Sequence, residues 1–253
     1  MEIARGVQLW SVKDEAARDL PGTLRRLADM GYEGVEFFGA STAPAPELKD
    51  MLSAVNLACC GWHVPFADLQ DERIETTIAF QKALGNPYLI VPILTNIETL
   101  AGWREHAAFF NRIAAQLARE HLRIGYHNHR FEFETMEGKL PQDVFFTETD
   151  ASVIMQLDIG HVAAGGADPV EVLERYPGRA TTVHVKPFSR AAGQKDVKEG
   201  YRPLLGEDDL PWAQILRVCR HTGGTLWQIV EYESDACPRL EGVERCLQAL
   251  CRM

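Results

Sequence analysis

Eight short apolar runs, separated by stretches in which apolar residues recur at helical spacing, most constrain the fold of this chain. The runs are rich in β-branched and aromatic side chains and cover residues 6–10, 34–38, 57–61, 88–93, 123–127, 154–158, 181–186 and 226–231. Runs of this length and composition predict β-strands. The strict alternation of strands with helices requires a parallel sheet with right-handed crossover connections.

The intervening stretches support this alternation. Leu20, Leu24 and Leu27 lie on one face of a helix before the second run, and the segments MGYEG, LGNPY, RYPGR and HTGGT place Gly or Pro where a helix ends and a strand begins. Eight strand–helix units in 253 residues, with no glycine-rich phosphate loop after the first strand, favour a closed barrel over an open doubly wound sheet. We therefore predict a single (β/α)8 TIM barrel domain that covers residues 1–253.

Composition argues against two classes of partner. The formal net charge of -10 and the pI near 5.3 do not suit a nucleic-acid-binding protein, which needs basic clusters to neutralise phosphates. The N-terminal segment lacks the pattern of a signal peptide, and no run approaches the roughly 18 apolar residues of a membrane-spanning helix. A cytoplasmic protein with no membrane or nucleic-acid partner is expected.

Polar residues end four consecutive predicted strands, which close with YHNH, LDIGH, VHVK and IVEYE. The active site of such a barrel forms at the carboxyl ends of its strands. The two-residue period of a strand places His127, Asp158, His184 and Glu231 on the inward face. A single strand-end His or Asp is more often a packing residue, but four on successive strands predict one divalent metal ion, from Mn, Mg, Fe, Co, Ni and Zn.

Other polar and aromatic residues at predicted strand ends are candidates for substrate contacts. Glu36 and His63 could bind sugar hydroxyls, support a metal ligand from behind, or cap the core. Trp10 and Trp62 could form an apolar platform for a sugar face, or simply pack in the interior.

The fifth and seventh strands add two further candidates. His129 shares a strand face with His127 and is a candidate substrate contact. Lys186 could neutralise an enolate or carboxylate, or pair with Glu233. The long segment 188–210 after the seventh strand carries four basic residues, so it is either a lid that contacts an anionic substrate or a solvated loop.

The motifs GVQLWSV, GYEGVEFFG, HNH, LDIGH, HVK and VEYE resemble the xylose isomerase-like barrel superfamily, specifically its sugar isomerase/epimerase branch, along nearly the whole chain. The resemblance implies one metal ion held by a carboxylate on strand five, Asp on strand six, His on strand seven and Glu on strand eight. Asp158, His184 and Glu231 match the last three. His127 stands where the family usually has Glu, and inosose-dehydratase-like members are similar in carrying His-rich motifs on this strand.

The resemblance implies an isomerase or epimerase that acts on a small keto-sugar or polyol through an enediolate. No phosphate-cradling glycine motif is evident at strands seven and eight, which favours an unphosphorylated substrate. Glu231 would be the base, and His161 would return the proton, because a metal-bound His127 cannot serve as the second base. The presence of His127 in place of the usual Glu favours, as an alternative, a lyase or dehydratase acting on a keto-inositol or 3-keto-glycoside. A non-catalytic sugar-binding barrel is a further alternative. A homodimer is the assembly expected from the family.

Overall fold

Eight parallel strands close into a barrel in the computed structural model, which describes residues 2–41 and 43–253. The strands follow one another in chain order, and the last pairs with the first. They are β1 (Ala4–Gln8), β2 (Gly34–Phe38), β3 (Ala58–His63), β4 (Tyr88–Val91), β5 (Arg123–His127), β6 (Ile154–Asp158), β7 (Thr182–Val185) and β8 (Trp227–Val230). The predicted (β/α)8 barrel is confirmed.

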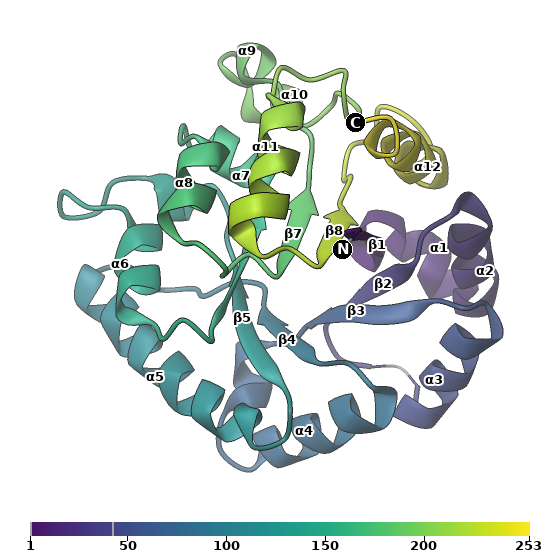
Figure 1. Ribbon diagram of the computed structural model, residues 1–253, viewed down its shortest axis with the longest axis horizontal. Coiled ribbons are helices and arrows are strands. Elements are labelled where there is room, and N and C mark those ends of the chain that lie inside the picture. The colour runs from purple at the N-terminus through teal and green to yellow at the C-terminus, as the bar shows by residue number, and fades with distance from the viewer. Residues whose placement is uncertain (1, 42) are drawn as a thin grey trace.

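Helices form a ring around the strands (Figure 1). The longer helices are α2 (Leu20–Met30), α3 (Ala45–Ala54), α4 (Arg73–Leu84), α5 (Leu100–Ala118), α6 (Pro141–Glu148), α8 (Pro169–Arg175), α11 (Trp212–Val218) and α12 (Arg239–Leu250). Shorter elements lie in the connections: α1 (Lys13–Arg18), α7 (Ile159–Ala164), α9 (Arg190–Gly193), α10 (Val197–Gly200), the 3₁₀ turns η1 (Leu9–Val12), η2 (Phe66–Leu69) and η3 (Phe131–Phe133), and the π-turn η4 (Cys219–Gly223). None of the helices within residues 2–41 and 43–253 is long and apolar enough to cross a bilayer.

Strand boundaries agree with the sequence prediction for β2, β5 and β6 and differ by one to a few residues elsewhere. The first strand ends at Gln8 because the Gln8 side chain accepts a hydrogen bond from the backbone N–H of Trp10 (3.1 Å), which begins η1. Trp10 therefore leaves the sheet and lies at the rim of the barrel, 40% exposed.

The interior of the barrel combines polar side chains with a few apolar ones, such as Ile90, Ile154 and Ile229, whereas the layer between strands and helices is apolar. Residues that point inward include Gln8, Glu36, Gln156 and His184, and each is fully buried. Large aromatic side chains fill the outer layer, such as Trp103, Phe110, Tyr126 and Phe145. Because buried polar groups must be paired, the inner polar residues form one hydrogen-bonded network, and this network positions the site.

Candidate active site

Four ligand-type side chains meet at the carboxyl ends of β5 to β8. One atom each from His127, Asp158, His184 and Glu231 lies within 4.8 Å of the others, and all four residues are buried. Asp158 and His184 are register partners on β6 and β7, and Glu231 directly follows β8. The structure thus brings together the four residues that period-two spacing placed on the inward face.

Asp158 shows that this cluster suits a cation. One carboxylate oxygen, Oδ1, accepts a hydrogen bond from the backbone N–H of His161 (2.7 Å). The other oxygen, Oδ2, is buried and has no hydrogen-bond partner among the residues that the structure describes. Oδ2 lies 4.0 Å from Nε2 of His127 and 3.9 Å from Nδ1 of His184. The Lys186 ammonium lies 3.8 Å from the same oxygen. A buried carboxylate oxygen that lacks a hydrogen bond and faces two imidazoles fits a divalent ion bound by nitrogen and oxygen ligands.

Glu36 holds the ring of His184 from below. The Nε2 atom of His184 lies 2.6 Å from Oε2 of Glu36, so Nδ1 faces the cluster, 2.9 Å from Oε2 of Glu231. Gln8 (2.8 Å) and Gln156 (2.7 Å) donate hydrogen bonds to Glu36, whose side chain is fully buried. A carboxylate behind a metal-ligating histidine fixes its tautomer and orientation. Glu36 therefore lies where it can support His184, and it is not among the residues that line the mouth cavity.

A glycine makes room for this carboxylate. The β2–β3 register shifts between Val35 and Glu36, and a Cβ atom on Gly61 would lie 2.3 Å from Oε1 of Glu36. We expect Gly61→Ala to destabilise the fold by about 1–3 kcal/mol, because the added methyl must displace a buried, fully hydrogen-bonded side chain. Urea denaturation monitored by circular dichroism measures this change. An unchanged midpoint would show that the Glu36 network has more freedom than its packing indicates.

Burial and neighbouring charges set the protonation of the cluster. Burial, followed by the nearby charge of His184, holds the pKa of His127 well below its usual range, so this ring is neutral and has a free lone pair. Burial opposes ionisation of Glu231, but the charges of Lys186 and His184 outweigh it and hold the pKa of Glu231 well below its usual range. Burial raises the pKa of Asp158 to about 7, against the attraction of Lys186. Glu231 therefore ionises more readily than Asp158.

A cavity of about 690 Å³ opens above the cluster. Its polar lining comprises His63, His127, His129, His161, Lys186, Glu231 and Glu233. The Lys186 ammonium lies 3.3 Å from Glu231 Oε2 and 3.4 Å from His161 Nε2, and the other ring nitrogen of His161 lies 2.8 Å from the Tyr201 hydroxyl. Lysine, histidine and tyrosine thus form a connected chain beside the ionised carboxylate.

The model of the family described as xylose isomerase-like TIM barrel matches residues 24–253. The chain belongs to this family. A solved structure similar in fold is a sugar phosphate isomerase/epimerase from Parabacteroides distasonis, 24% identical, with a TM-score of 0.86 over 99% of this chain and 96% of that chain.

Curated relatives of this xylose isomerase-like chain are inosose dehydratases. The enzyme from Clostridium botulinum strain Alaska E43 is 24% identical over 244 residues, which cover 84% of this chain and 81% of the relative. The enzyme from Clostridium tetani is 25% identical over 155 residues, 57% of this chain and 50% of the relative. In several of these matches the chain spans about half the length of the curated relative.

The xylose isomerase-like barrel places most, but not all, of the predicted substrate contacts in the mouth cavity. Trp10, His63, His129, His161 and Lys186 line it, and Glu36 lies below it. Trp62 lies elsewhere.

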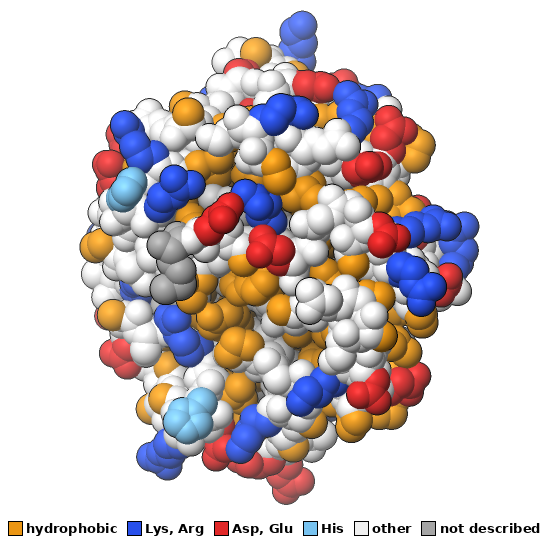
Figure 2. Space-filling model, turned by 45° about the vertical axis from the view of Figure 1, so that its right-hand side comes forward, with side chains coloured by type: hydrophobic (Ala, Val, Ile, Leu, Met, Phe, Trp, Pro, Cys, Tyr) orange, Lys and Arg blue, Asp and Glu red, His pale blue; other side chains and the backbone are white. Residues whose placement is uncertain are grey.

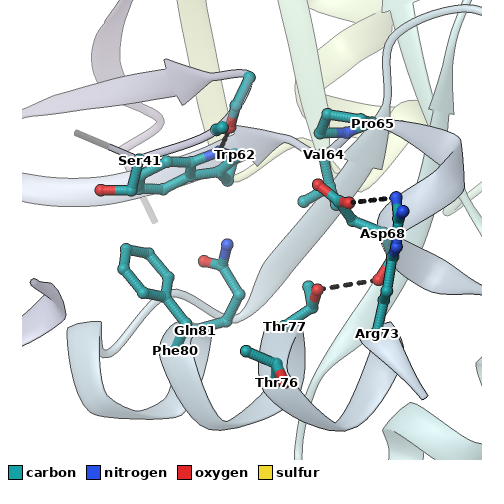
Figure 3. A pocket seen from close by; sticks show the side chains of 12 residues that line it. Ser41, Trp62, Val64, Pro65, Asp68, Arg73, Thr76, Thr77, Phe80 and Gln81 are labelled. Atoms are coloured by element: carbon teal, nitrogen blue, oxygen red, sulfur yellow. Dashed lines mark hydrogen bonds and ion pairs between the residues drawn. The ribbon is translucent and has the colours of Figure 1, made fainter. Parts of the chain in front are cut away.

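Trp62 lines a separate cavity of about 310 Å³ between β3 and α4, where its ring faces Phe80 (Figure 3). Its ring stacks on Phe37, and its indole N–H donates to the Gly39 carbonyl (2.8 Å). Of the two interpretations of Trp62, this position agrees with packing in the interior and not with a platform in the mouth cavity, because successive residues of β3 alternate in direction. His63 points into the barrel, so Trp62 points out of it.

Two residues of the site were not predicted to belong to it, although one of them was named as a partner of Lys186. Tyr201 lies in the long segment 188–210, which folds partly into α9 and α10, and its hydroxyl contacts His161. Glu233, which had been named only as a partner of Lys186, also lines the cavity, and its carboxylate accepts a hydrogen bond from Lys186 (3.2 Å). The basic residues of the segment do not converge on the cavity: Arg190 binds the Ala167 carbonyl, and Arg202 pairs with Asp235.

Proposed function

We propose that this chain is a metal-dependent lyase that removes a proton beside the carbonyl of a small keto-sugar or keto-polyol and expels a leaving group from the next carbon. One observation carries the proposal. Of the two carboxylates in the four-residue cluster, Glu231 lines the mouth cavity, and it lies beside the chain formed by Lys186, His161 and Tyr201. A single base next to proton donors suits an elimination.

The residues present fit a divalent ion, as the buried Oδ2 of Asp158, which has no hydrogen-bond partner among the described residues, indicates. His127, Asp158, His184 and Glu231 would hold it. When bound, such an ion supplies Lewis-acid polarisation of a carbonyl oxygen. The inosose dehydratases among the relatives support a dehydratase-type reaction.

Glu231 is the proposed base. Its carboxylate is ionised, because the charges of Lys186 and His184 outweigh the effect of burial on its pKa. It can accept the proton from the carbon, and the resulting electron pair forms the new carbon–carbon double bond as the leaving group departs.

Lys186 is the proposed source of positive charge and of hydrogen bonds to the departing group. Burial alone would lower its pKa, but Glu231 and Asp158 raise it, so the ammonium stays charged. His161 Nε2 accepts from this ammonium, and the other ring nitrogen of His161 contacts the Tyr201 hydroxyl. As the bond from carbon to the leaving oxygen breaks, the Lys186 ammonium, which lines the cavity, can give that oxygen a proton.

Isomerisation or epimerisation is the second candidate, and it was the first expectation from the sequence. The observation that favours it is His161, whose pKa is held well below its usual range by burial and then by the charge of Lys186. A neutral imidazole in the cavity can return a proton to carbon. It would take the place of the second glutamate that the His127 position lacks.

Incubating the Mn²⁺-loaded protein in D2O with keto-inositols, ketohexoses and 3-keto-glycosides separates these reactions. We expect an absorbing enone and release of the β-substituent or water from at least one substrate. Deuterium in recovered or isomerised sugar without an enone would instead support isomerisation. Protein depleted of metal is the control. Absence of both products across the panel would contradict an enzymatic role and favour a sugar-binding barrel.

Nucleic acid does not suit this surface. Acidic and basic side chains are interspersed on the face drawn in Figure 2, and the formal net charge is -10. A phosphodiester substrate would require clustered positive charge along a groove. A small neutral sugar derivative remains the proposed substrate.

A further inference from the structure

The mouth cavity has two chemically different walls. The polar wall comes from the carboxyl ends of β5 to β8 and carries the imidazoles, Lys186 and the two glutamates described above. The opposite wall comes from the ends of β1 to β4 and the segments that follow them. Apart from His63 and Thr95 it is apolar, with Trp10, Phe38, Pro65, Phe66, Ala67, Pro92 and Ile93. A sugar alone can stack one C–H face on a single ring but presents hydroxyl groups on its other sides, so it would leave most of this second wall unmatched.

The rings of the apolar wall are held in place from behind. The Trp10 and Phe38 rings meet edge to face with their centroids 5.0 Å apart, and the Lys13 ammonium lies 3.7 Å from the Trp10 ring centroid. Phe66 packs against Phe109 of α5, with ring centroids 4.9 Å apart. Rings fixed by such contacts lose little side-chain entropy when a ligand binds, which favours a preformed binding surface.

Exposure and volume both indicate that this wall has a ligand. Trp10 (40%) and Ile93 (39%) are two of the four exposed large hydrophobic side chains in residues 2–41 and 43–253, and both line this cavity. The cavity measures about 690 Å³. Sites of about 300–1,000 Å³ hold drug-sized molecules, so a hexose of about a dozen non-hydrogen atoms would fill only part of this one.

We propose that the natural substrate is an aryl derivative of a sugar or polyol, whose aromatic group lies on the wall formed by Trp10, Phe38 and Phe66. This inference rests on the proposed function, since it assumes that the sugar faces Glu231 and Lys186. The aromatic ring would then lie against the exposed edge of Trp10. The site therefore selects its substrate by two groups, a polyol and an aromatic substituent.

Binding of unreactive probes tests this assignment without chemistry. Calorimetry compares 4-nitrophenyl glycosides with the matching methyl glycosides, neither of which carries the carbonyl that the proposed reaction needs. We expect the aryl member of at least one pair to bind about tenfold more tightly. We expect Trp10→Ala to remove about tenfold of aryl affinity and to change methyl glycoside affinity by less than about twofold.

Leu226→Ala is the matched control, because Leu226 is equally exposed but precedes β8 at the other end of the barrel. Its affinities should equal those of the unmodified protein. Equal affinity for aryl and methyl members, or no aryl binding at about 1 mM, would overturn the assignment. So would a dimer that dissociates in Trp10→Ala, since a second copy would then cover the wall. Because these probes do not react, the two experiments are independent. The aryl site can be disproved while the D2O experiment still shows a reaction, and an aryl site can be found while the D2O experiment shows none.

Discussion

Glu231→Gln is expected to lower kcat for proton removal by about 10²–10⁴-fold, the usual contribution of a positioned general base. The glutamine keeps the volume of the side chain and can still contact His184, which lies 2.9 Å from Glu231, but it cannot accept a proton from carbon. Because Glu231 is also one of the four proposed metal ligands, solvent-deuterium exchange is followed by NMR at saturating Mn²⁺ with whichever keto-sugar reacts, so that the loss reports on the base.

Glu233→Gln is the matched comparison for this variant. Both glutamates contact Lys186, at 3.3 Å and 3.2 Å, but Glu233 has a partly exposed side chain and is not among the four clustered ligands. We expect its loss of exchange to be less than about tenfold. Equal losses in the two variants would show that the charge near Lys186 matters and that Glu231 has no special role as a base.

Asp158→Asn is expected to weaken divalent-metal affinity by at least about 100-fold, and turnover with it. Residues behind a metal ligand already contribute about 10–100-fold in affinity, so loss of a charged ligand should cost more. The asparagine retains an oxygen that can accept from the His161 N–H and so cap α7, as Oδ1 does now at 2.7 Å. The fold should therefore survive, and Mn²⁺ titration by calorimetry gives the affinity.

Asp168→Asn controls for the loss of a helix cap. Asp168 caps α8 by accepting from the Val170 N–H (2.9 Å), and it lies outside the mouth cavity. Its metal affinity and turnover should match those of the unmodified protein. If Asp158→Asn retained full activity after metal-free purification, the proposed metal site would be wrong.

Much of the fold and of the site could be predicted from the sequence because two regular patterns determine them. Alternation of strand and helix patterns gave the barrel, and the two-residue period of a strand brought His127, Asp158, His184 and Glu231 to one face. The same period, applied to β3, would have separated His63 from Trp62. The depth of a side chain inside the barrel is harder to judge, because Glu36 faces inward yet is fully buried and does not line the mouth cavity.

The remaining features depend on packing between distant segments. Tyr201 reaches His161 only because the segment after β7 folds back over the barrel, and no local sequence pattern predicts this contact. The space that Gly61 leaves for Glu36 likewise follows from a register shift between β2 and β3. Such contacts arise from tertiary structure and lack a sequence period of their own.

The central claim is that four side chains from β5 to β8 bind one divalent ion. Anomalous diffraction from crystals soaked in Zn²⁺ tests it most directly. We predict one strong peak at about 2.0–2.2 Å from nitrogen atoms of His127 and His184 and from carboxylate oxygens of Asp158 and Glu231. No peak at the mouth, or a peak bound by other residues while these four remain paired with one another, would contradict the claim.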